Sequence, residues 1–290
     1  MMESPACDSH VHVFDPARFA YSPSRKFTPD TASATLLTQY LDEAGMARVV
    51  LVQPSVYGTD NRCMVDAIGQ LGPRAKGIAV VSPQVSADEL HVLSAAGVVG
   101  ARLNMVVNRS GNAAEACAAV QALDETLPKA WHIQLHVPLD VLLGLAPVIQ
   151  RSQRRFVLDH MGLPAVQEGT ETGRWSSLLT MLRAGQLHVK LSAPYLSSCR
   201  VAPYADVRPF VESLVQARPD AVVWGSNWPH TQGVHRPERG DLSCIETFRN
   251  EDRQGWSDSC TRWLGAELMD RLHANAARLY GWSDAPDGPP

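Results

Sequence analysis

The sequence lacks the features that define several classes of protein. No segment approaches the roughly 20 consecutive apolar residues of a membrane-spanning helix. Lys and Arg total 26 against 30 Asp and Glu, so the net charge of −4 offers no basic surface for nucleic acid or an anionic membrane. The six cysteines include no CxxC pair, which argues against a zinc cluster. Residues 1–7 lack the basic region and apolar run of a signal peptide, so we expect a cytoplasmic protein with reduced thiols.

Short apolar runs instead recur along almost the whole chain. With 290 residues, 45% of them hydrophobic, the chain can build one large core. Eight runs predict strands, at residues 7–14, 48–53, 77–81, 98–103, 132–137, 156–160, 188–192 and 221–225. Helical patterns lie between or after them, at 34–44, 62–71, 87–95, 112–123, 139–149, 175–183, 207–216 and 260–277. This alternation predicts an α/β fold, a (β/α)8 TIM barrel.

A doubly wound open sheet is the alternative, but no GxGxxG or GxxxxGK[ST] motif follows any predicted strand. We expect residues 1–282 to form a single catalytic barrel and residues 283–290 to be a disordered tail. The segments 15–32 and 227–254 are long for simple connections. Both follow predicted strands at the end of a barrel where active sites lie, so we expect them to form walls or a lid.

Four histidines lie at the ends of predicted strands. His10 and His12 are two residues apart on the first strand and should project to the same face, which Asp8 would share at a lower level. His136 ends the fifth strand and His160 the sixth. A single strand-end histidine is most often an ordinary polar residue, but four from three strands predict a site. Converging imidazoles suit metal ligation, proton transfer or polarisation of a carbonyl.

The eighth predicted strand continues into Gly225, Ser226 and Asn227. The two small residues would let backbone and ligand approach closely. Asn227 offers an amide that donates and accepts hydrogen bonds but cannot act as a base. A turn residue would be equally consistent with this position.

Three stretches carry a family resemblance: Cys-Asp-Ser-His-Val-His-Val-Phe-Asp-Pro at 7–16, Leu-Asp-His-Met-Gly at 158–162 and Trp-Gly-Ser-Asn-Trp-Pro-His at 224–230. With these, the chain resembles the amidohydrolase-related family of the amidohydrolase superfamily. Within it, the chain is most similar to the 2-pyrone-4,6-dicarboxylate lactonases and their relatives, from about residue 6 to residue 282. The motifs are highly specific for the family and less so for the substrate.

The resemblance implies a distorted (β/α)8 barrel that opens lactones without a divalent metal. It implies that His10, His12 and His160 polarise the lactone carbonyl, while an aspartate on the eighth strand activates water. Arginines that hold the substrate carboxylates would correspond to Arg102, Arg109 and Arg200, although surface charge is the ordinary role of such residues. Arg102 ends an apolar strand, where a guanidinium without an anion would be costly to bury.

Two positions depart from the family pattern. Asn227 replaces the aspartate that would be the general base, so another group takes the proton, or no base is needed, or the residue was substituted. His136 stands where the pyrone lactonases carry tyrosine and the zinc members of the superfamily carry a metal ligand. Loss of a carboxylate weakens a cation site and gain of an imidazole strengthens one. We expect no cofactor; if zinc is present, its ligands would be His10, His12 and His136.

Further residues are candidates for hydrogen bonds to a substrate: Ser55, Tyr57 and Asn61 after the second strand, together with Trp228. Tyr195 is another candidate to line the pocket, although core packing is as common a role for an aromatic side chain.

The leading hypothesis is a hydrolase that opens a carboxylate-bearing lactone, either 2-pyrone-4,6-dicarboxylate-like or a sugar-acid lactone, without a metal. The alternatives are a lactone isomerase of the galactarolactone type and a zinc-dependent hydrolase or decarboxylase. A ligand-binding barrel without activity fits less well. The expected partner is a small-molecule lactone or dicarboxylate, and the sequence leaves the oligomeric state open.

Overall fold

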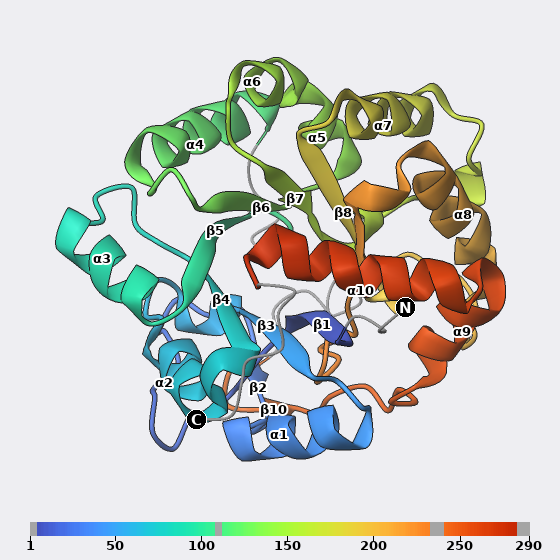
Figure 1. Ribbon diagram of the computed structural model, residues 1–290. Coiled ribbons are helices and arrows are strands. Elements are labelled where there is room, and N and C mark those ends of the chain that lie inside the picture. Colours follow the sequence, from blue (N-terminus) through green and yellow to red (C-terminus); the bar gives the residue numbers. More distant parts are fainter. Residues whose placement is uncertain (1–4, 108–111, 233–240, 283–290) are drawn as a thin grey trace.

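The computed structural model describes residues 5–107, 112–232 and 241–282. Eight parallel strands form one sheet that curls into a nearly closed barrel (Figure 1). Their order follows the chain: β1 (Cys7–Val11), β3 (Arg48–Val52), β4 (Ala75–Ala79), β5 (Val98–Asn104), β6 (His132–His136), β7 (Phe156–Leu158), β8 (Leu187–Leu191) and β9 (Val222–Trp224). Each lies within two residues of a predicted strand at its start, and the predicted (β/α)8 barrel is confirmed.

The segment after β9 closes the barrel against β1. Val11 forms a parallel bridge with Trp228, the His12 amide donates to the Trp228 carbonyl at 2.9 Å, and the Asn227 amide donates to the His10 carbonyl at 2.9 Å. Gly225 allows this approach, because a Cβ there would lie 2.9 Å from the His10 backbone nitrogen. We call this junction between residues 10–12 and residues 227–228 the seam, and it therefore contains several of the predicted site residues.

Helices surround the barrel (Figure 1). They are α1 (Ala34–Glu43), α2 (Arg62–Leu71), α3 (Ala87–Ala95), α4 (Ala113–Thr126), α5 (Leu139–Gly144), α6 (Ala146–Arg151), α7 (Gly173–Ala184), α8 (Arg208–Ala217), α9 (Gly255–Leu264) and α10 (Ala266–Tyr280). Side-chain N-caps fix several starts: Ser33 caps α1, Ser86 caps α3, Asn112 caps α4 and Thr172 caps α7.

Two predicted helices are each divided in the structure. The pattern at 139–149 becomes α5 and α6, because Pro147 in the first turn of α6 supplies no backbone N–H to continue α5. The pattern at 260–277 becomes α9 and α10, which are separated by Gly265 in a positive-φ conformation (φ 87°). Hydrophobic periodicity alone does not mark such breaks.

Helix α10 covers the N-terminal end of the barrel, where it crosses in front of the strands in Figure 1. His273 of α10 contacts the backbone of Cys7, the first residue of β1, at 3.2 Å. Ala276, Leu279 and Tyr280 pack on a second apolar cluster, which is built from strand residues that include Cys7 and Val223. The opposite, C-terminal end is therefore the one left for a site.

The two long segments meet through a small parallel sheet that periodicity did not predict. β2 (Thr28–Pro29) pairs with β10 (Ile245–Glu246), and each belongs to one of the segments expected to wall the site. Residues 233–240 and the predicted disordered tail at 283–290 lie outside the described residues. Within the described chain, no helix combines the length and apolar character needed to span a bilayer.

Candidate active site

A β-bulge lies in β1 at His10, and His12 follows the strand directly. Asp8 pairs with Val49 and Val11 with Leu51, so β1 has one residue more than its partner strand over this interval. The His10 ring lies 5.0 Å from the His12 ring and 4.7 Å from the His160 ring. The expectation that Asp8 shares their face is wrong, because the bulge changes the alternation. Asp8 instead accepts a hydrogen bond from Tyr40 of α1 at 3.1 Å.

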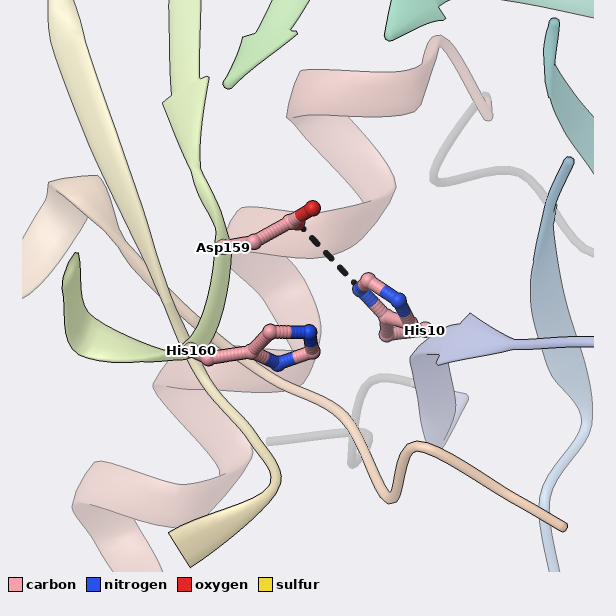
Figure 2. Close-up of side chains that lie close together, drawn as sticks. All are labelled: His10, Asp159 and His160. Carbon is pink, nitrogen blue, oxygen red and sulfur yellow. Dashed lines mark ion pairs between the residues drawn. The ribbon is translucent and has the colours of Figure 1, made fainter. Parts of the chain in front are cut away.

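His160 follows β7 in a 3-10 turn, η3 (Asp159–Gly162), with a left-handed backbone (φ 51°). Its Nδ1 lies 2.9 Å from Ser192 Oγ, just beyond β8. Left-handed conformations of non-glycine residues are uncommon and gather at functional sites. Because β7 has already ended, Asp159 and His160 both reach the site, where strict alternation would have separated them. Figure 2 shows these two side chains converging with His10.

Asp159 is the anionic centre of the cluster. Its Oδ2 accepts hydrogen bonds from Arg102 Nε at 2.9 Å and Gln134 Nε2 at 3.1 Å, and its Oδ1 lies 3.3 Å from His10 Nδ1 (Figure 2). Burial would raise the pKa of the Asp159 carboxyl, but Arg102, His10 and Lys190 hold it well below its usual value. The carboxylate is therefore ionised and already paired.

Lys190 of β8 lies beneath this cluster and is fully buried. Its ammonium donates to the Ser9 carbonyl at 2.7 Å and to Gln134 Oε1 at 2.8 Å, and it lies 3.5 Å from His10 Nδ1 and 4.0 Å from Asp159. Burial lowers the pKa of Lys190 to about 8, against the opposing effect of Asp159. Lys190 therefore carries its charge at neutral pH.

His136 ends β6 beside the same group. Its ring lies 5.0 Å from the His160 ring, and its Nδ1 lies 3.0 Å from Arg102 Nη2. Burial lowers the pKa of all four strand-end histidines: to about 4 for His12, to about 3 for His160, and well below the usual value for His10 and His136. At neutral pH the site presents neutral imidazoles beside fixed charges.

Asn227 lies at the seam with a left-handed backbone (φ 67°) and is 3% exposed. Its amide nitrogen donates to the Tyr195 hydroxyl at 2.7 Å, and its Oδ1 is buried without a hydrogen-bond partner in the described part of the chain. The backbone bond to His10 places Asn227 next to the histidines. The structure thus brings together His10, His12, His136, His160 and Asn227.

The remaining predicted residues divide into two groups. Arg102 and Ser55 line a cavity of about 300 Å³, together with apolar residues such as Val81 and Leu103, and Arg102 connects this cavity to His136. The internal anion that compensates Arg102 is Asp159, which the sequence argument did not foresee. Arg102 Nη1 makes no hydrogen bond to the described residues and remains available.

Other predicted side chains have structural partners or lie away from the cluster. The Tyr57 hydroxyl accepts from the Asp15 amide at 2.8 Å, and Asn61 bonds both backbone polar groups of Val80. Trp228 stacks on Tyr40 with ring centroids 5.6 Å apart. Arg200 is exposed and Arg109 lies outside the described residues.

Sequence reasoning assigned no role to Asp159, Lys190, Gln134 or Ser192. Lys190 and Ser192 could have been recognised from the sequence, because they alternate with Leu187, Val189 and Leu191 along one strand. Asp159 could not, because its side chain reaches the site only through the turn at His160. Tyr195 was considered only as a pocket-lining residue, and its partner is Asn227.

A metal ion could use one ligand atom each from His10, Asp159 and His160, which lie within 4.8 Å of one another. This set shares His10 with the predicted set of His10, His12 and His136. The charges do not fit a divalent cation, however: the single carboxylate is already paired with Arg102, and the Lys190 ammonium lies 3.5 Å from His10 Nδ1. With Asn227 neutral, the described residues of this cluster offer no further carboxylate.

The barrel and its strand-end histidines define an amidohydrolase-type enzyme. The sequence profile of the amidohydrolase family matches residues 7–282, and the chain belongs to this family. The family resemblance drawn from the three motifs is thereby confirmed.

Several characterised relatives resemble the chain over most of their length. A 2-pyrone-4,6-dicarboxylate hydrolase of Comamonas testosteroni is 34% identical over 248 residues, which cover 82% of this chain and 81% of the relative. A 4-sulfomuconolactone hydrolase of Rhizobium radiobacter is 30% identical (82% and 81% covered). A D-galactarolactone isomerase of Agrobacterium fabrum is 28% identical (78% and 76% covered).

A solved structure resembles the fold over nearly its whole length. It is a probable 2-pyrone-4,6-dicarboxylic acid hydrolase of Acinetobacter baumannii with citric acid bound. Its TM-score is 0.74 at 26% identity, with 96% of this chain and 99% of that chain covered.

Proposed function

We propose that this protein is a hydrolase that opens lactones carrying carboxylate groups, and that it works without a metal cofactor. The observation that carries the proposal is a cluster of neutral imidazoles packed beside the Arg102 guanidinium at the C-terminal end of the barrel. Neutral imidazoles can polarise an ester carbonyl and move protons, and such preorganised groups stabilise a developing oxyanion.

Arg102 provides the anion recognition in this proposal. Two of its nitrogens are held by Asp159 and His136, which fixes the plane of the guanidinium. Nη1 is left to donate a charge-assisted hydrogen bond to a substrate carboxylate. Arg109 and Arg200 remain further candidates. The named relatives act on lactones with carboxylate or sulfonate groups, which supports the same substrate class.

The charge balance of the site supports a metal-free reaction. Arg102 and Lys190 compensate Asp159, so a divalent ion would add uncompensated positive charge in a buried position. A zinc-dependent hydrolase or decarboxylase would need an anionic ligand that Asn227 does not provide.

Asn227 favours a second candidate, a lactone isomerase. In that reaction a hydroxyl group of the substrate replaces water as the nucleophile, so positioning by an amide matters more than a strong base. The similarity to a D-galactarolactone isomerase supports a sugar-acid lactone as the substrate of this second candidate.

A panel of four lactones tests both candidates: 2-pyrone-4,6-dicarboxylate, 4-sulfomuconolactone, D-galactarolactone and the uncharged γ-butyrolactone. We expect an anionic lactone to yield the open acid, with no turnover of γ-butyrolactone and no loss of activity after treatment with EDTA and 1,10-phenanthroline. A rearranged lactone as the product would select the isomerase. Turnover of none of the four, or loss on chelation that zinc restores, would contradict the proposal.

A further inference from the structure

Two histidines of the site are locked in opposite tautomers by their partners. His12 Nδ1 lies 2.7 Å from the backbone carbonyl oxygen of Val52. A carbonyl oxygen only accepts hydrogen bonds, so Nδ1 of His12 carries the proton. In the neutral ring, Nε2 of His12 then presents a lone pair.

His136 has the reverse arrangement. Its Nδ1 lies 3.0 Å from Arg102 Nη2, and a guanidinium only donates hydrogen bonds. Nδ1 of His136 must therefore accept, which places the proton on Nε2. This Nε2–H is buried and has no hydrogen-bond partner among the described residues. A buried donor without a partner costs about 1–3 kcal/mol, so a ligand atom that satisfies it would be held strongly.

Both rings belong to one cluster. Successive ring centroids from His12 to His10, His160 and His136 are 5.0, 4.7 and 5.0 Å apart. One proton acceptor and one proton donor thus belong to the same cluster of four imidazoles.

We propose that His12 is the general base of the reaction and that His136 donates the hydrogen bond that stabilises the oxyanion. The proposal rests on the proposed lactone-opening function and applies to either nucleophile. The nucleophile's oxygen bonds to the lactone carbonyl carbon and its proton passes to His12 Nε2. The carbonyl oxygen, now an oxyanion, accepts from His136 Nε2–H. The ring C–O bond then breaks, and the leaving oxygen takes the proton back from His12.

Other residues fit the base less well. Asn227 has no basic atom. The His10 side chain is fully buried, whereas His12 is 6% exposed and His136, the proposed donor, is 7% exposed. His160 shares its Nδ1 with a hydroxyl that can donate or accept, so its tautomer is not fixed.

Hydroxylamine separates the two roles, because it attacks lactones without a general base but still needs a polarised carbonyl. The substrate is 2-pyrone-4,6-dicarboxylate or, if the panel selects it, D-galactarolactone. We expect His12→Gln to lower the native reaction about 10²–10⁴-fold and hydroxamate formation much less. We expect His136→Leu to lower both about 10²–10³-fold, and His136→Gln, which retains an N–H, to recover part of both.

His91→Gln, on the exposed face of α3, is the matched control and should leave both rates unchanged. Parallel losses of both reactions in His12→Gln would overturn the base assignment. Unchanged hydroxamate formation in His136→Leu would overturn the donor assignment.

The ¹⁵N resonances of the imidazoles test the proton positions in the wild-type protein without any substrate. We expect a protonated Nδ1 for His12 and a protonated Nε2 for His136, assigned by loss of each signal in the Gln variants or by contacts to labelled Val52 and Arg102. The reversed pattern at either ring would refute the proposal even if lactones are opened. The expected pattern in a protein that opens none of the panel would support the proton assignment and reject only the proposed function.

Discussion

Left-handed backbone conformations mark the ends of three successive barrel strands. His160 follows β7, Ala193 follows β8 and Asn227 follows β9, with φ values of 51°, 49° and 67°. Such conformations cost about 1–3 kcal/mol each and persist only where the surrounding structure holds them. Asparagine tolerates this region better than most residues. These unfavourable backbone conformations lie at the positions where the chain leaves a strand and its side chains turn into the site.

The variant Asn227→Asp tests what the amide at the seam does. We expect kcat to fall about tenfold, because a carboxylate loses the N–H that donates to Tyr195 and repels an anionic substrate. The measurement is kcat for the lactone selected by the panel, with metal content determined on the same sample, since a carboxylate would strengthen any cation site. A large gain in metal-free hydrolysis would instead identify Asn227 as a replaced general base.

At the residue scale, the sequence predicted the histidines better than their partners. His10, His12, His136 and His160 could be placed because strand ends in a barrel share one face. Asp159 could not, since alternation puts it opposite His160 and only the left-handed turn reverses that. Arg102 was expected to contact a substrate anion, and the sequence argument did not foresee that the internal Asp159 also pairs with it.

At the scale of elements, Gly225 is the point where β9 approaches β1. We expect Gly225→Ala to lower the free energy of unfolding by about 1–3 kcal/mol, because its Cβ would lie 2.9 Å from the His10 backbone nitrogen and Cβ. The activity of the folded variant should also fall, since the displaced segment carries Asn227. The matched control is Gly69→Ala within α2, where a Cβ meets nothing within 4 Å; we expect it to stabilise by about 0.5–1 kcal/mol. Urea unfolding of both variants provides the comparison, and equal stabilities would contradict the steric argument.

Strand–helix alternation predicted every strand of the barrel because buried parallel strands read as short apolar runs. The features that the sequence did not predict have identifiable causes. Periodicity continues through Pro147 and Gly265, where backbone constraints end one helix and begin the next. The pairing of β2 with β10 depends on two segments far apart in the chain, and neither has an apolar run to reveal it.

At the scale of the whole molecule, the buried histidines predict sensitivity to acid. Burial lowers the folded-state pKa to about 4 for His12 and about 3 for His132 and His160, below the unfolded value of about 6.5. Between these values the unfolded chain binds more protons, so the free energy of unfolding falls as pH falls. Each such histidine contributes about 2 kcal/mol of destabilisation between pH 7 and pH 5.

We therefore expect Tm to drop by several degrees between pH 7 and pH 5, measured by calorimetry in buffers of equal ionic strength. The buried Asp8, whose pKa burial raises, acts in the opposite direction, but it is one group against several. A Tm that stays constant over this range would mean that the imidazoles are not buried in neutral form.

The seam between β1 and the segment after β9 has a consequence for biosynthesis. Its two sides are made at nearly opposite ends of the chain, and the hydrogen bonds that join them come from His10, His12, Asn227 and Trp228. Contacts this distant in sequence form slowly, because loop closure must precede any stabilisation they provide. A nascent chain still on the ribosome, or a fragment cut in the middle, contains His10 and His12 without the segment after β9 that positions them. We therefore expect catalytic activity to appear only after the segment that follows β9 has paired with β1, and we expect an incompletely synthesised barrel to be inactive.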